Sequence, residues 1–185
     1  MTGRTTSDAP SSAADEVALA PGPANLRWRH PVEADHAGLV GLIDDWYGGR
    51  RVHGAFGRFL LRHFSATSLL AEAEGGRVAG YLVGFVSPDL PAEAFVHSAA
   101  VNPNRRRQGI GRELYRRFEL LAAQRGAERL VVHVWPGDPI AVAFHRGIGF
   151  DPDTGPGTMP LYGIPAYPDY DFPGEDRVIF VRPIG

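Results

Sequence analysis

The 185-residue chain contains neither cysteine nor lysine. The lack of cysteine excludes disulfide bonds, thiolate nucleophiles and thiolate metal ligands. The lack of lysine excludes a Walker phosphate-binding loop, which needs that residue. No run approaches 18 consecutive apolar residues, and the N-terminus has no apolar signal-peptide core. We therefore expect a cytoplasmic protein with no membrane partner.

The chain also lacks an excess of charge of either sign. Its 19 basic residues, all arginine, face 21 acidic ones, and the resulting net charge of −2 gives no global field that favours nucleic acid. A hydrophobic content of 44% fits one globular domain with a real core. Residues 1–24 lack aromatic side chains and are rich in small and polar ones, so we expect a disordered tail followed by a single domain at 25–185.

The most informative stretch of the sequence runs from Phe95 to Gly126. Phe95–Val101 is short and apolar, which predicts a buried strand, and Asn102-Pro103-Asn104 ends it. Apolar residues then recur every three or four positions, which predicts one face of a helix that ends at Gly126: Ile110, Leu114, Phe118 and Leu121.

The turn between this strand and this helix has the composition of an anion site. Arg106-Arg107-Gln108-Gly109-Ile110-Gly111 places two glycines where the helix begins, so a ligand can approach the backbone closely. The first N–H groups of a helix lack internal partners, and the helix dipole adds positive potential there. With arginine side chains beside them, these groups are suited to a pyrophosphate.

After a strand that ends in Val101, the pattern Arg106-x-x-Gly109-x-Gly111 resembles the acetyl-CoA signature of the GNAT superfamily of N-acyltransferases. A second superfamily pattern is matched by Asp138, Ala141, Phe144, His145, Gly149 and Phe150. The resemblance implies acetyl-CoA as cosubstrate and, as the residues that contact it, Ala99, Val101, Arg106, Arg107, Gln108, Gly109, Ile110, Gly111, Arg112, Asp138, Ala141 and Phe144. Asp138 replaces the asparagine usual in the family, and a plain helix cap is the favoured interpretation of this residue.

The rest of the chain agrees with that resemblance, which covers about residues 25–150. Strands are expected at 25–29, 68–74, 77–86, 95–101, 129–135 and 177–182, and helices at 31–47, 56–64, 109–126 and 138–146. The order is that of the GNAT fold, an α/β (mixed α+β) fold whose mixed, mostly antiparallel sheet is flanked by helices. The first two helices usually cover the acceptor site in this superfamily. Residues 151–175 are expected to be mostly loop.

Two histidines are candidates for acid–base catalysis. His145 occupies the place of the family's tyrosine, which often protonates the leaving CoA thiolate, and it acts either as that acid or only as a packing residue. His97 shares a strand face with Phe95, Ala99 and Val101 if side chains alternate. That position resembles the catalytic strand histidines of arylalkylamine N-acetyltransferases, so His97 is either the base or a core residue. His133 is interpreted as structural, and no histidine spacing suggests a metal site.

These observations predict an N-acetyltransferase that transfers the acetyl group to a primary amine by direct attack, with a strand N–H near Val101 stabilising the oxyanion. The acceptor is a small-molecule amine or a peptide amino group. Carboxylates beside aromatic residues, at 44–47 and 169–176, indicate either a solvated surface or a wall that attracts a cationic amine. The alternatives are a non-catalytic acyl-CoA-binding module and a lysine or N-terminal protein acetyltransferase. A homodimer is one open assembly.

Overall fold

The computed structural model describes residues 13–20, 22 and 25–185. Within them, seven strands form one sheet in the order β1-β2-β3-β4-β5-β9-β6. The strands are β1 (Arg27–Arg29), β2 (Leu69–Ala73), β3 (Arg77–Val86), β4 (Glu93–Val101), β5 (Arg129–Val134), β6 (Asp151–Pro152) and β9 (Val178–Pro183). β4 and β5 are parallel, and the other neighbouring pairs are antiparallel. The prediction of a mixed, mostly antiparallel sheet is confirmed.

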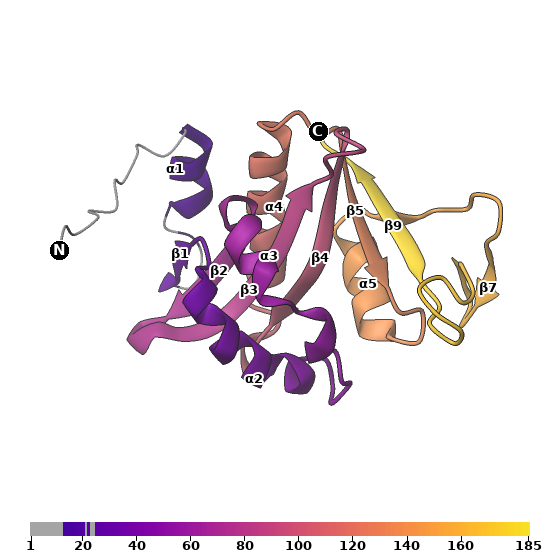
Figure 1. The fold of residues 1–185 in the computed structure, drawn as a ribbon, viewed down its shortest axis with the longest axis horizontal. Coiled ribbons are helices and arrows are strands. Elements are labelled where there is room, and N and C mark those ends of the chain that lie inside the picture. Colours follow the sequence, from indigo (N-terminus) through magenta and orange to yellow (C-terminus); the bar gives the residue numbers. More distant parts are fainter. Residues whose placement is uncertain (1–12, 21, 23–24) are drawn as a thin grey trace.

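Helices cover both faces of this sheet (Figure 1). On one face, α2 (His36–Trp46) and α3 (Arg58–His63) pack over β2 and β3. On the other, α4 (Ile110–Ala123) and α5 (Pro139–Gly147) enclose the larger part of the core. Short 3₁₀ turns join these elements: η2 (Glu33–Asp35), η3 (His53–Ala55), η4 (Ser65–Thr67), η5 (Glu74–Gly76) and η6 (Pro103–Arg105).

The position of α4 follows from its apolar stripe and from two glycines of β3. Ile110, Leu114 and Phe118 are buried, as the periodicity predicts. A side chain at Gly84 would meet the Phe118 ring at 2.7 Å, and one at Gly80 would come within 3.1 Å of Ile110. Glycine at these two positions therefore lets α4 lie close against the sheet, which fixes the N-terminus of α4 beside the end of β4.

The described part of residues 1–24 contains a helix, α1 (Ala13–Leu19), where disorder was expected. Ala18 is fully buried, and the Arg117 guanidinium donates hydrogen bonds to the carbonyls of Ala18 and Ala20, at 2.5 and 2.7 Å. Arg117 also lies 4.1 Å over the Trp28 ring. This helix is anchored through a small residue and backbone carbonyls, which composition does not reveal. Residues 1–12, 21, 23 and 24 lie outside the described residues.

The segment at 151–175 also contains more structure than expected. β7 (Met159–Leu161) and β8 (Ile164–Ala166) form a separate hairpin around Tyr162 and Gly163, which both have positive φ. This hairpin lies next to β9 and α5 at one end of the molecule (Figure 1). None of the helices described is long and apolar enough to cross a membrane.

Candidate functional site

The central feature of the site is an opening in the sheet between β4 and β5. The two strands pair only from Glu93–Arg129 to Val96–Val132. β4 continues to Val101 and β5 to Val134, so the strands separate beyond that pair. The Asn102 N–H donates to Ala79 on the β3 side, so the N–H groups of Val101 and Ala99 point toward the opening by strand alternation.

A β-bulge at His97 changes which side chains share a face of β4. Val83 pairs with Ser98, whereas the next residue of β3, Gly84, pairs with Val96, so His97 is the extra residue. The expectation that Phe95, His97, Ala99 and Val101 share one face is therefore wrong.

The two faces can be identified from the packing partners of each residue. Ala99 and Val101 pack against the core under α4, whereas Phe95 contacts Phe85 and His133 on the other face. His97 also lies on that other face, where it reaches η3. The bulge thus directs the histidine toward α2 and α3, the side on which an acceptor is expected.

The side chain of His97 is neutral and oriented. Its Nε2 lies 3.0 Å from the carbonyl oxygen of Ala55, and a carbonyl only accepts, so Nε2 carries the hydrogen. Nδ1 is then the unprotonated nitrogen. Burial lowers the pKa of His97 below its usual 6.5, although the Ala55 carbonyl opposes this effect. His97 can therefore accept a proton at neutral pH.

Tyr47, at the end of α2, contacts the exposed edge of β4. Its hydroxyl accepts from the Ala99 N–H at 3.3 Å, and it lies 3.1 Å from both the Ala99 carbonyl and the Ser98 hydroxyl. Tyr81 approaches the same Ser98 hydroxyl at 3.1 Å. Burial raises the pKa of Tyr47, so this hydroxyl stays protonated and can donate. The sequence analysis noted the stretch 44–47 for its carboxylates beside aromatic residues and gave Tyr47 no role of its own.

An Asp–His pair lies on the same side of the sheet. The Asp44 carboxylate accepts from the N–H groups of Val52 and His53, and its second oxygen lies 2.6 Å from Nδ1 of His53. This bonding lowers the pKa of Asp44 and fixes the loop between α2 and α3. Spacing alone gave no signal for this pair, because the loop brings together residues nine positions apart.

The residues predicted to bind a pyrophosphate form one exposed turn. Arg106, Arg107, Gln108 and Gly109 are all solvent-exposed at the N-terminus of α4. Gly109 has a φ of 80° and Arg107 a φ of 65°, so the turn uses left-handed backbone at two positions. The Arg106 guanidinium donates to the Trp46 carbonyl at 2.8 Å, which connects this turn to the end of α2.

The other residues predicted to contact the cofactor lie where α4 meets α5. A side chain at Gly111 would meet the Phe144 ring at 3.0 Å, so this glycine also serves helix packing. Asp138 caps α5 by accepting from the N–H groups of Ile140 and Ala141, which confirms its interpretation as a helix cap. The buried side chain of Ile110 belongs to the core, so only its backbone can face a ligand, and exposed Arg112 donates to the Gly147 carbonyl at 3.3 Å.

His145 lies on the buried face of α5, with 7% of its surface exposed. Nδ1 lies 2.7 Å from the Ala141 carbonyl, so it carries the hydrogen, and Nε2 lies 2.7 Å from the Tyr115 hydroxyl. The ring stacks on Phe180 at 5.5 Å. Burial lowers the pKa of His145 to about 4. This environment supports the packing interpretation of His145, because a neutral imidazole with both nitrogens bonded is a poor acid at neutral pH.

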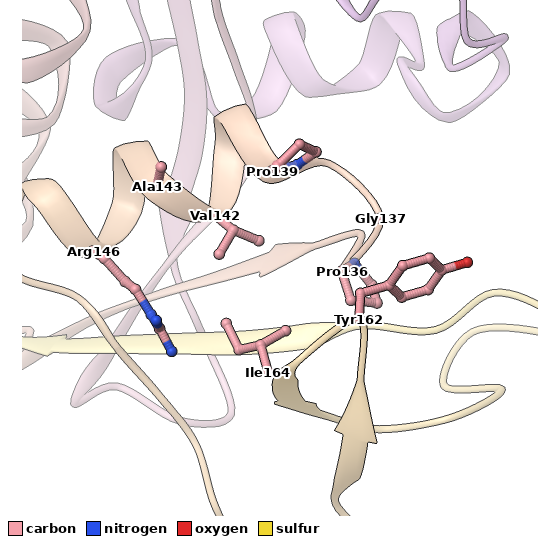
Figure 2. A pocket seen from close by; sticks show the side chains of 8 residues that line it. All are labelled: Pro136, Gly137, Pro139, Val142, Ala143, Arg146, Tyr162 and Ile164. Carbon is pink, nitrogen blue, oxygen red and sulfur yellow. The ribbon is translucent and has the colours of Figure 1, made fainter.

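A pocket of about 540 Å³ lies elsewhere, between α5 and the β7–β8 hairpin. Figure 2 shows Val142 and Arg146 of α5 facing Ile164 of the hairpin, with Tyr162 at one end. Val142 and Arg146 lie on a different face of α5 from Phe144, which packs toward α4. None of the residues that line this pocket lies on β4 or β5.

Comparison with known proteins identifies the family of the chain. The model described as acetyltransferase (GNAT) family matches residues 25–150. The chain is 28% identical over 114 residues to L-2,4-diaminobutyric acid acetyltransferase of Nocardia farcinica. That match covers 62% of this chain and 58% of the relative, so the chain spans less than two thirds of the length of the curated relative it matches.

Solved structures share the fold. Diaminobutyrate acetyltransferase EctA from Paenibacillus lautus, in complex with L-2,4-diaminobutyric acid and coenzyme A, has a TM-score of 0.64 at 22% identity, covering 89% of this chain and 98% of its own. Ard1 from Thermoplasma volcanium has a TM-score of 0.67 at 19% identity and covers 86% and 98%. YncA from Salmonella typhimurium, solved with acetyl-CoA, has a TM-score of 0.62 at 19% identity and covers 88% and 95%.

Proposed function

Because the chain belongs to the acetyltransferase (GNAT) family, we propose that it transfers the acetyl group of acetyl-CoA directly to a primary amine. The observation that carries the proposal is the opening between β4 and β5 beside the N-terminus of α4. It joins an anion-binding turn to a free strand edge. These are the two features needed to hold a phosphate-bearing thioester and to present its carbonyl to an amine on the other side of the sheet.

The turn from Arg106 to Gly111 is proposed to bind the pyrophosphate. Its backbone N–H groups and the exposed guanidinium of Arg107 fit an anion in chemistry and in access. Acetyl-CoA supplies the activated thioester and the leaving sulfur. The N–H groups of Ala99 and Val101 line the opening, and the Val101 N–H is the proposed donor to the oxyanion.

His97 is the proposed base. An alkyl ammonium has a pKa near ~10, so most acceptor molecules arrive protonated at neutral pH. The unprotonated Nδ1 of His97 takes this proton directly or through one water molecule. Holding both reactants in place contributes most of the rate, and the base contributes roughly 10²–10⁴-fold.

Tyr47, rather than His145, is the proposed proton donor to the leaving sulfur. Its hydroxyl stays protonated and already contacts the backbone of Ala99 at the opening. As the carbon–sulfur bond breaks, the electron pair stays on sulfur, which takes the Tyr47 proton. The nitrogen gives up its second proton as the amide forms, and this proton returns to the Tyr47 phenolate through Ser98 or water. The feature that favours a non-catalytic module is the absence of the family tyrosine at His145, and the proposed role of Tyr47 supplies an alternative proton donor.

The acceptor is proposed to be a small amine. The curated relative and one structural neighbour are named for diaminobutyrate, whereas other neighbours are named for an alanine of a ribosomal protein, such as the ribosomal-protein-S18-alanine N-acetyltransferase of Escherichia coli. A peptide acceptor is the alternative. Reaction in the cytoplasm and a homodimeric assembly stay predictions from the sequence.

The experiment that tests this function is an acceptor screen. Small amines, amino acids and peptides are each mixed with acetyl-CoA and the protein, and the free thiol released is measured. We expect release above the acceptor-free rate with at least one small amine. Release with peptides alone would favour the protein acetyltransferase. Binding of CoA without release for any acceptor would favour the non-catalytic module.

A further inference from the structure

The end of α2 and the turn that follows it contact residues on both sides of the opening between β4 and β5. Tyr47 contacts the backbone of Ala99 on β4, and three residues later Arg50 lies over the ring of Trp135, which directly follows β5. The distance from the Arg50 guanidinium carbon to the ring centroid is 4.4 Å. Gly48 and Gly49, with φ values of 72° and 83°, make the tight turn that lets Arg50 cross to β5.

Trp135 is itself held in a fixed orientation. A side chain at Gly137 would come within 2.4 Å of its ring, so the indole lies directly against the backbone there. The ring also meets that of Tyr162 edge-on, at 6.0 Å between centroids. Trp135 therefore provides a firm surface for a stacked guanidinium, which loses little freedom when it binds a ligand.

Within the described part of the chain, the half-buried side chain of Arg50 has no ion-pair partner. None of the carboxylates in the described residues lies within ion-pair distance of it. Arg50 still acts on the opening, because its positive charge opposes the effect of burial on the pKa of the Tyr47 hydroxyl. An arginine stacked on an aromatic ring keeps its in-plane N–H groups free, and these match the two oxygens of a carboxylate.

The carboxylates expected to attract a cationic amine are already engaged. Asp171 and Glu175 both pair with Arg177, at 2.7 and 2.8 Å. Asp44 binds His53, whereas the side chain of Asp169 accepts from the Gly174 N–H.

The two remaining carboxylates of this set do not change that picture. The side chain of Asp176 accepts from the Asp169 N–H, and Asp45 is exposed to solvent on α2. Three of the six carboxylates, Asp44, Asp171 and Glu175, thus bond to a basic side chain, which weakens their attraction for a cationic amine. Next to Trp135, at the end of β5, the charged group is the guanidinium of Arg50.

We propose that Arg50, stacked on Trp135, binds a carboxylate of the acceptor, so that the acceptor is an amino acid rather than a simple amine or polyamine. The inference rests on the proposed acetyl transfer, since it names the substrate class of the same site. A polyamine would bring a second positive charge toward Arg50 and is disfavoured by repulsion. An amino acid brings an anion that pairs with Arg50, and an amino group, the α-amino group or a second one, that serves as the acceptor.

The test compares ligands that differ only in the carboxylate. L-2,4-diaminobutyric acid is paired with 1,3-diaminopropane, and each common amino acid with its decarboxylated amine. Calorimetry measures their binding to the full chain, with and without CoA. We expect at least one amino acid to bind about 10-fold or more tightly than its partner, because charge-assisted hydrogen bonds are being compared with none.

Arg50→Gln is expected to remove this preference, Arg50→Lys to keep part of it, and Arg51→Gln, a change at the exposed neighbouring arginine, to keep all of it. Three results would overturn the inference: no preference in the wild type, an unchanged preference in Arg50→Gln, or a loss of CoA affinity in Arg50→Gln as large as the loss of amino-acid affinity. The last result would assign Arg50 to a phosphate of CoA.

Thiol release, measured on the same samples, distinguishes the amino-acid inference from the proposed acetyl transfer. Release without a carboxylate preference refutes only the amino-acid inference, and a preference without release refutes only the acetyl transfer.

Discussion

The hydroxyl of Tyr115 on α4 lies 2.7 Å from Nε2 of His145 on α5. Because Nδ1 of His145 donates to the Ala141 carbonyl, Nε2 must accept the Tyr115 hydrogen. The pair thus joins the two helices on this face of the sheet through a neutral imidazole. A protonated imidazole carries a hydrogen on Nε2 as well, so the Tyr115 hydroxyl could no longer donate to it, which links this contact to pH.

The first prediction is a loss of stability in acid that depends on His145. Its pKa is lowered from 6.5 to about 4 by burial, so the unfolded chain binds a proton between these values and the folded chain does not. Stability therefore falls as pH falls from about 6.5 to about 4, by roughly 3 kcal/mol for this one group. Denaturant unfolding at several pH values measures it.

His145→Gln provides the matched variant, since an amide can bond to both neighbours without titrating in this range. The difference in unfolding free energy between wild type and variant should shrink as pH falls from 6.5 to 4. A difference that stays constant over this range would show that His145 is not held neutral.

The second prediction concerns Tyr47 as proton donor. Tyr47→Phe keeps the ring and removes the hydroxyl that contacts Ala99 and Ser98. We expect kcat to fall about 10²-fold or more, with CoA affinity changed only a few-fold. Steady-state kinetics and calorimetry on the same preparation measure the two effects. If kcat is unchanged while chemistry limits the rate, Tyr47 is not the donor.

The third prediction concerns His97 as the base. Burial lowers its pKa below 6.5, so kcat/KM should rise with pH through a group titrating below that value and level off above it. His97→Ala should flatten this rise, while His63→Gln, at an exposed histidine of α3, should leave its shape intact. If both variants keep the rise of kcat/KM with pH that the wild type shows, solvent rather than His97 deprotonates the amine.

The fourth prediction concerns α1. Removal of residues 1–20 would leave the buried guanidinium of Arg117 without the carbonyls of Ala18 and Ala20. We expect the free energy of unfolding to fall by about 2–3 kcal/mol, because the hydrogen bonds to a charged group are lost while Arg117 keeps its ion pair with Glu113. A double-mutant cycle with Arg117→Leu measures the coupling. If the substitution costs the same with and without α1, the helix and the arginine are independent.

Much of the fold could be predicted from the sequence, since its signals are local. The stripe of Ile110, Leu114 and Phe118 and the glycine turn before it marked α4, and they agree with the structure. The faces of β4 could not be predicted correctly, because the bulge at His97 depends on pairing with β3. Strict alternation placed Ala99 on the wrong side.

The site was predictable only where one segment carries it. The turn from Arg106 to Gly111 is contiguous and was identified as a pyrophosphate site, which stays a prediction. The contacts of Tyr47 with Ala99 and of Arg50 with Trp135 join residues 52 and 85 positions apart, and no local pattern marks them. His145 matched a family position, but the residues that bury it come from β9 and α4. The motif contains no residue of these elements, so it could not predict the burial.

The central claim is direct transfer of an acetyl group to an amine, and the product itself tests it. The protein is incubated with acetyl-CoA and each amine that supported thiol release in the screen. Mass spectrometry then identifies the acetylated product. We expect N-acetylated acceptor in amounts equal to the thiol released, and a rate at least about 10²-fold lower for the double variant Tyr47→Phe/His97→Ala. Thiol release without acetylated acceptor would contradict the claim, because the acetyl group would then have passed to water.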